Sequence, residues 1–121
     1  MELNNGLEKS LMKKTTQMRR GVLELCVLSI IAEEEVYPSD IIFKLKEFKL
    51  IIKEGTLYPL LSRLKEGGLL HYTWKESDQG PPRKYFHITK EGKAFLNGLL
   101  GTWNELVQAV QQTTKNINHN E

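Results

Sequence analysis

The fold is decided by residues 54–64, which read Glu54-Gly55-Thr56-Leu57-Tyr58-Pro59-Leu60-Leu61-Ser62-Arg63-Leu64. Its leucines recur at the i, i+3, i+4, i+7 spacing, which predicts a helix with one apolar face. The other side carries small, hydroxyl-bearing and basic residues, and Pro59 fits an early helical turn. Two interpretations are open for this stretch. It is either a recognition helix that approaches a polyanion or an ordinary amphipathic core helix.

Two further helices are predicted before this stretch. Residues 16–32 are apolar almost all the way round, so a second layer or a partner chain must cover them. Pro38 starts a helix that runs to about Phe48, and its predicted buried residues are Ile41, Ile42, Leu45 and Phe48. Residues 50–52 form an apolar linker or a brief strand. Residues 1–15 are predicted to be a flexible N-terminal arm, with a frayed helix as the alternative.

After this stretch, Gly67-Gly68 is a strong helix stop. A β-hairpin follows, with strands over 69–74 and 83–88 and a loop over 75–82. Thr89 is the expected N-cap of a last helix over 90–112, before a polar, frayed tail over 113–121. The stripe on this helix predicts dimerisation with a second copy, and its residues are Phe95, Leu96, Leu99, Leu100, Trp103, Leu106, Val107 and Val110.

Composition is that of a small soluble globular protein of 121 residues. The net charge is only +2, but residues 41–90 hold ten Lys and Arg against five acids, whereas residues 21–40 hold five acids and no base. The middle of the chain would therefore attract phosphates, although a solvated lysine-rich surface has the same composition. No apolar run approaches the roughly 18 residues of a membrane helix, and residues 1–6 lack a secretion signal. The single cysteine, Cys26, is expected to be a buried spectator in a reducing cytoplasm.

The order of elements predicts an α+β, mostly helical fold: a winged helix-turn-helix over 16–89, with an extra C-terminal dimerisation helix over 90–112. An enzyme is not expected. His71, His87 and His119 are scattered, and no nucleophile motif or Gly-rich phosphate loop occurs, so neither a metal nor a cofactor is predicted.

Several motifs in the same order resemble the PadR family of bacterial transcriptional regulators, in its small single-domain subgroup. They are Arg20-Gly21-x-Leu23-Glu24, Gly55-Thr56-Leu57-Tyr58-Pro59 with Arg63-Leu64, Gly67-Gly68-Leu69-Leu70, Trp74, Gly80-Pro81-Pro82-Arg83-Lys84-Tyr85-Phe86, and Ile88-Thr89-x-x-Gly92. The resemblance implies a homodimeric repressor. The third helix would lie in the major groove, the hairpin wing near the minor groove or the backbone, and the last helix in the dimer.

The resemblance also implies DNA contacts by Thr56, Tyr58, Arg63, Arg83 and Lys84. Ser62 and Lys53 join this set as weaker candidates from their place on or beside the third helix. Ser39 stands where the family commonly has a tyrosine, and its hydroxyl is a candidate phosphate contact. Alternatives are open for three of these residues. Arg63 would pair with Glu66, the ring of Tyr58 would pack under the wing, and the two wing bases would simply be solvated.

The two tryptophans are expected to differ in role. Trp74, on the first wing strand, is predicted to be a core residue. Trp103 lies in the middle of the last apolar stripe, where it is either a dimer-core aromatic or one wall of a cavity for a planar aromatic inducer. The predicted function is a dimeric repressor that binds a pseudo-palindromic operator in double-stranded DNA and is released by a small molecule. The alternative is a winged-helix module for protein interaction without specific DNA binding.

Overall fold

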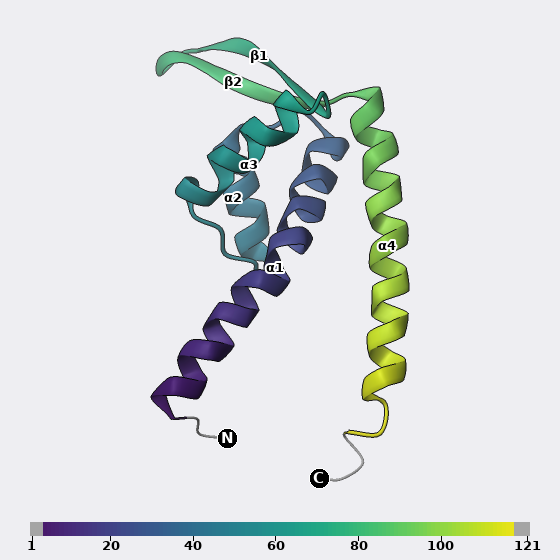
Figure 1. Cartoon of the computed structure of the whole chain (residues 1–121). Coiled ribbons are helices and arrows are strands. Elements are labelled where there is room, and N and C mark those ends of the chain that lie inside the picture. The colour runs from purple at the N-terminus through teal and green to yellow at the C-terminus, as the bar shows by residue number, and fades with distance from the viewer. Residues whose placement is uncertain (1–3, 118–121) are drawn as a thin grey trace.

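Residues 4–117 are described by the computed structural model, and they form four helices and one antiparallel hairpin (Figure 1). The chain order is α1 (Asn5–Glu33), α2 (Pro38–Glu47), α3 (Glu54–Glu66), β1 (Leu70–Ser77), β2 (Gly80–Ile88) and α4 (Lys90–Thr114). The hairpin lies across one end of the helices, and α1 and α4 extend away from it side by side (Figure 1). The predicted α+β, mostly helical winged helix-turn-helix is confirmed.

Helix α1 is longer than predicted. The side chain of Asn4 accepts a hydrogen bond from the Leu7 N–H at 2.8 Å, so the helix is capped at its start. Residues 5–15, predicted to be a flexible arm, are instead the first turns of α1, and residues 1–3 lie outside the described part of the chain. Leu7 and Leu11 remain more than half exposed there, because nothing else in the chain covers this half of the helix.

The core joins α1, α2 and α3 beneath the hairpin. Its most completely buried side chains are Val27, Leu28, Ile31, Ile41, Leu45, Leu57 and Leu61. The predicted apolar face of α3 is confirmed, since all four of its leucines are buried. The prediction for Phe48 is wrong, because this side chain is 71% exposed. The linker over 50–52 is a loop rather than a strand, and Ile52 anchors it in the core.

Helices α2 and α3 end in the same way. After α3, Gly68 has a φ of 78°, the Gly68 N–H donates to the Lys65 carbonyl at 3.0 Å, and the Leu69 N–H donates to the Leu64 carbonyl at 2.9 Å. This is the Schellman arrangement, and it confirms the predicted stop. After α2 the same pair of bonds forms around Lys49, whose φ is 65°. A side chain therefore occupies a left-handed position that favours glycine.

We expect Lys49→Gly to raise the free energy of unfolding by about 0.5–1 kcal/mol, since relief of the left-handed strain exceeds the extra entropy of an unfolded glycine. Urea denaturation would measure the change. Lys49→Ala is the matched control, because it removes the same charge and keeps the strained conformation. A gain as large in the alanine variant would assign the effect to charge instead.

The hairpin is longer than predicted, and its turn is tighter. β1 runs to Ser77 and β2 starts at Gly80, so most of the predicted loop over 75–82 is strand. Ser77 pairs with Gly80, and a register shift lies between Lys75 and Ser77. β2 also pairs with the segment between α1 and α2. The Phe86 N–H donates to the Val36 carbonyl at 2.8 Å, and the Val36 N–H donates back at 3.3 Å.

Thr89 joins the end of α3 to the start of α4. Its side chain accepts a hydrogen bond from the Gly92 N–H at 2.9 Å, which confirms the predicted N-cap. Its hydroxyl donates to the Gly68 carbonyl at 2.7 Å, and its N–H donates to the Leu69 carbonyl at 3.0 Å. Helix α4 continues to Thr114, two residues into the predicted tail, and residues 118–121 of that tail lie outside the described part.

Candidate nucleic-acid interface

Helix α3 carries exposed polar residues on both sides of its buried leucine face. Tyr58 and Ser62 point to the hairpin side, and Thr56 and Arg63 lie on the side of α1. Lys53 is the exposed N-cap residue of the helix. The predicted contacts of this helix are therefore divided between two flanks, as expected for a helix that projects from the surface.

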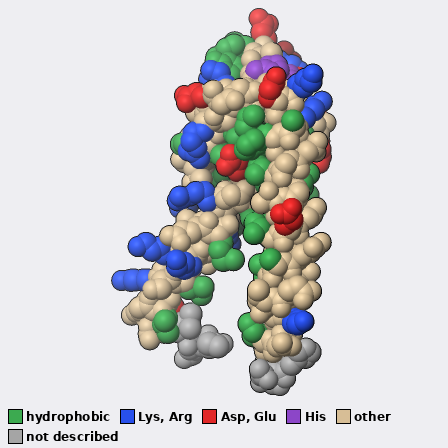
Figure 2. Space-filling view, turned by 45° about the vertical axis from the view of Figure 1, so that its right-hand side comes forward, with side chains coloured by type: hydrophobic (Ala, Val, Ile, Leu, Met, Phe, Trp, Pro, Cys, Tyr) green, Lys and Arg blue, Asp and Glu red, His purple; other side chains and the backbone are tan. Residues whose placement is uncertain are grey.

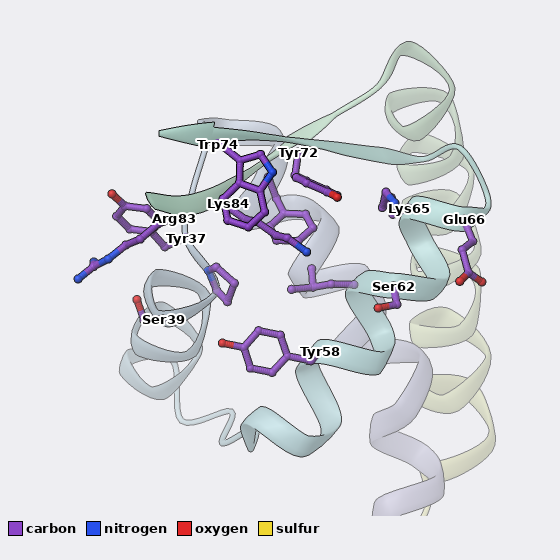
Figure 3. Close-up of a pocket in the computed structure, with 13 residues that line it drawn as sticks. Tyr37, Ser39, Tyr58, Ser62, Lys65, Glu66, Tyr72, Trp74, Arg83 and Lys84 are labelled. Atoms are coloured by element: carbon purple, nitrogen blue, oxygen red, sulfur yellow. The ribbon is translucent and has the colours of Figure 1, made fainter. Parts of the chain in front are cut away.

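The larger group meets in what we call the α3–wing cleft, a hollow of about 630 Å³. It lies between α3, the start of α2 and the hairpin (Figure 3). Five of the predicted DNA contacts line it: Ser39, Tyr58, Ser62, Arg83 and Lys84. Its other lining residues are Tyr37, Pro38, Leu61, Lys65, Glu66, Tyr72, Trp74 and Phe86.

A second hollow of about 630 Å³, the α1–α3 cleft, lies on the opposite flank of α3. Thr56 and Arg63 line it together with Thr16 and Arg20 of α1. Within residues 4–117 no carboxylate lies within 4.0 Å of the Arg63 guanidinium, so the alternative pairing with Glu66 is not observed. The arginine is therefore available to a phosphate or a base edge.

Aromatic rings, rather than carboxylates, hold the cations of the α3–wing cleft. Lys84 Nζ lies 4.4 Å from the Tyr72 ring centre and 5.4 Å from that of Trp74. Lys65 Nζ lies 5.0 Å from the same tyrosine ring, and the Arg83 guanidinium carbon lies 5.0 Å from the Tyr37 ring. In the described chain none of these three cations forms an ion pair. Their charges are oriented by cation–π contacts and remain available to an anion.

The opposite face of the hairpin is attached to the end of α1. Lys75 forms an ion pair with Glu35, whose other oxygen lies 3.6 Å from His87 Nε2. The same ring nitrogen lies 2.9 Å from the Thr73 hydroxyl. Burial, followed by the charges of His71 and Lys75, lowers the pKa of His87, so this imidazole is neutral at neutral pH. These contacts fix the base of the wing.

Near the cleft, Tyr37 and Tyr85 lie with their ring centres 3.8 Å apart. Hydrogen bonding to Tyr37, with smaller contributions from burial and neighbouring charges, raises the pKa of Tyr85 to about 12. Tyr85 is therefore neutral at physiological pH. The positive charge of Arg83 beside this pair is not cancelled by a phenolate.

Comparisons with known proteins agree with this geometry. The sequence profile of the Transcriptional regulator PadR-like family matches residues 27–98. The chain belongs to the PadR-like family. Members of this family are transcriptional regulators rather than enzymes, and the winged helix-turn-helix described above is a DNA-binding fold within it.

Three solved PadR-family structures resemble the chain. A PadR-like transcription factor from Bacteroides fragilis is 51% identical, with 84% of this chain and 98% of that chain covered and a TM-score of 0.72. A PadR family regulator from Eggerthella lenta is 30% identical, covers 91% of this chain and 96% of its own, and has a TM-score of 0.82. A PadR-like regulator from Bacillus cereus is 40% identical, covers 80% and 95%, and has a TM-score of 0.71. An uncharacterized protein of Lysinibacillus sphaericus is 32% identical over 94 residues, which are 75% of this chain and 86% of that protein.

Several residues of this PadR-like interface escaped prediction. Trp74, predicted to be a core residue, is 61% exposed and lines the α3–wing cleft. Tyr37, Lys65 and Tyr72 line the same cleft and were not singled out. One signal was present in the sequence, because Trp74 and Lys84 become directly opposite each other once the hairpin register is known.

The PadR-like chain also has two features that bear on other classes of protein. No helix among residues 4–117 has the length and hydropathy needed to cross a membrane. Over the same residues, no three His, Cys, Asp or Glu side chains gather as a metal site would require. Cys26 is half-buried, and burial raises the pKa of its thiol, as expected for an unreactive cysteine.

Proposed function

We propose that the protein is a dimeric repressor that places α3 in the major groove of an operator and its hairpin wing against the phosphate backbone. The observation that carries this proposal is the α3–wing cleft, where hydroxyls of α2 and α3 and three cations without ion pairs lie on one surface. Such groups suit phosphate oxygens, which supply affinity and position the protein on the duplex. Thr56 and Arg63, on the other flank of α3, are the candidates for contacts with base edges.

Dimerisation is supported by the apolar stripe of α4. Leu100, Trp103, Leu106 and Val110 are between 40% and 57% exposed, although their spacing is that of a buried helix face. Hydrophobic side chains of α1 and α4 face each other across the space between these helices (Figure 2). Leu96 is removed from the predicted dimerisation set, because it is buried in the core of its own chain. The remaining members, including Leu99 and Val107, would pack against a second copy.

A two-fold dimer would present two α3 helices to one face of DNA. Recognition helices of such dimers read half-sites about one helical turn apart, which is why the operator would be pseudo-palindromic. Release by a small molecule is part of the proposal, as is a cytoplasmic location. Trp103 would flank a site for a planar aromatic inducer at the two-fold axis, and binding there would change the angle between the α4 helices and the half-site spacing.

Removal of the wing charges tests the DNA interface. We expect Arg83→Ala/Lys84→Ala to weaken binding to all DNA sequences by about tenfold and to reduce the slope of log K against log [salt] by about 2, since two phosphate contacts are lost. A salt-titrated gel shift with the protein's own upstream DNA is the measurement.

The matched control is Lys90→Ala/Lys93→Ala, which removes the same charge from exposed positions of α4 outside both clefts. This control should retain most of the affinity and the slope. Equal losses in the two double variants would show a general effect of net charge, and unchanged binding in the wing variant would exclude the wing from the interface. If the unmodified protein binds no DNA, the protein-interaction module becomes the better description.

A further inference from the structure

The α3–wing cleft has a chemical character that DNA backbone contacts do not require. Its floor is apolar, formed by Leu61 and Phe86, and one wall is the exposed face of Trp74. Backbone phosphates and sugars offer no flat apolar group to such a surface. The aromatic part of the cleft is therefore in excess of what phosphate binding needs.

The charges around this aromatic surface have one sign. Lys65 and Lys84 both approach the Tyr72 ring, and Arg83 lies beside them on β2, whereas Glu66 is the single acid in the lining. The protein's own lysines already occupy the ring faces that would attract a cationic ligand. A cation is therefore disfavoured, and a ligand with a negative charge would find two ammonium groups near a flat ring.

The dimensions also suit a small molecule. The volume of about 630 Å³ lies within the range of about 300–1,000 Å³ typical of ligand sites, which combine an apolar lining with a few polar groups. Figure 3 shows Tyr58, Tyr72, Trp74 and Lys84 around one hollow, contributed by α3 and the hairpin. These are also residues that the proposed operator complex would use.

The geometry points to the α3–wing cleft as a binding site for a planar aromatic carboxylate, with the ring system against Trp74 and Tyr72 and the carboxylate between Lys65 and Lys84. Binding there excludes the phosphate backbone from the wing, so the ligand competes with DNA directly. Ligand binding stands on the cleft alone, and the competition rests on the proposed function. This site is distinct from the one proposed beside Trp103, which lies on α4 outside the cleft.

Two tryptophans allow a site-resolved test. Protein labelled with 5-fluorotryptophan gives one ¹⁹F resonance for Trp74 and one for Trp103, which Trp74→Phe and Trp103→Phe variants assign. Titration with 2-naphthoate is expected to shift the Trp74 resonance saturably. The neutral 2-naphthamide, of nearly the same shape, is expected to bind about tenfold more weakly because it lacks the charge-assisted hydrogen bonds. Absence of a saturable shift at Trp74, or a shift at Trp103 alone, would overturn the proposal.

Charge variants identify the carboxylate partners. Lys65→Ala/Lys84→Ala should weaken naphthoate binding at least about tenfold while leaving naphthamide binding nearly unchanged. Lys90→Ala/Lys93→Ala should retain the naphthoate affinity, since those lysines lie outside the cleft. Equal naphthoate affinity in the two double variants would refute the assigned contacts.

A gel shift in the presence of naphthoate tests the competition. Saturating naphthoate should raise the apparent dissociation constant for operator DNA in proportion to its concentration, and naphthamide at the same concentration should have a much smaller effect. A ternary complex of unchanged DNA affinity would overturn the competition. Failure of the protein to bind DNA without ligand would reject the proposed function and leave the ¹⁹F result valid for the cleft.

Discussion

Replacing Trp103 with glutamate is expected to convert the protein to a monomer and to weaken operator binding by at least about a hundredfold. Trp103 lies in the middle of the apolar stripe of α4, and a two-fold axis would bring two introduced carboxylates into the same buried interface. Unpaired buried charges are costly, so the monomer would become the stable species. A monomer then binds one half-site without the effective concentration that the second half-site supplies.

Sedimentation velocity would measure the oligomeric state, and the gel shift would measure affinity. Because Trp103 is 41% exposed within a single chain, the variant should keep its helical circular dichroism. Gln108→Glu is the matched control, since it introduces the same charge on the opposite side of the helix. A stable dimer of the Trp103 variant would contradict the proposed interface. Loss of the dimer in the control alone would place the interface on the other face of α4.

Gly92→Ala is expected to lower the free energy of unfolding by about 3 kcal/mol, the upper part of the range for overpacking in a close-packed site. A methyl group at this position would meet the Leu69 carbonyl oxygen, and it would lie 2.7 Å from Ile88 Cγ1. The oxygen belongs to backbone that also accepts the Thr89 N–H, so it cannot move away without loss of that bond. Glycine is therefore required at this point for close approach of α4 to the end of α3, and not for a special backbone angle.

Urea denaturation followed by circular dichroism measures this change. Gly101→Ala is the internal control, because a side chain there meets nothing within 4 Å and alanine favours the helix by about 0.5–1 kcal/mol. The two glycine variants of one helix should therefore change stability in opposite directions. Equal stability of Gly92→Ala and the unmodified protein would mean that the junction relaxes at no cost.

Local patterns in the sequence were sufficient for much of the fold. The leucine spacing of α3, the glycine stop after it and the Thr89 cap each depend on contacts within a few residues, and all three are confirmed. The hairpin turn was predicted too long, because Pro81 and Pro82 were taken as loop residues. They lie at the start of β2, beside the turn, where strands tolerate a missing donor.

The candidate site was predicted only in part, since it depends on long-range packing. The side chain of Trp74 alternates with its strand neighbours, but which face of the hairpin is covered depends on where the helices pack. The α3–wing cleft brings together Tyr37, Lys65 and Trp74, which come from three separate segments. No spacing within the chain predicts that meeting. Ser39, Tyr58 and Lys84 were singled out through the family motifs, and the structure places them along one hollow.

The hydrogen bonds of Thr89 have a mechanical consequence. One residue links the last carbonyls beyond α3 to the first turn of α4, so no flexible linker separates the reading head from the dimerisation helix. Helix α4 has 25 residues and is thus roughly 37 Å long. A sideways shift of about 3 Å at its far end corresponds to a rotation of about 5° for a rod of this length. α3 and the hairpin would turn with it as one body, and the operator spacing that the dimer accepts is then set at Thr89.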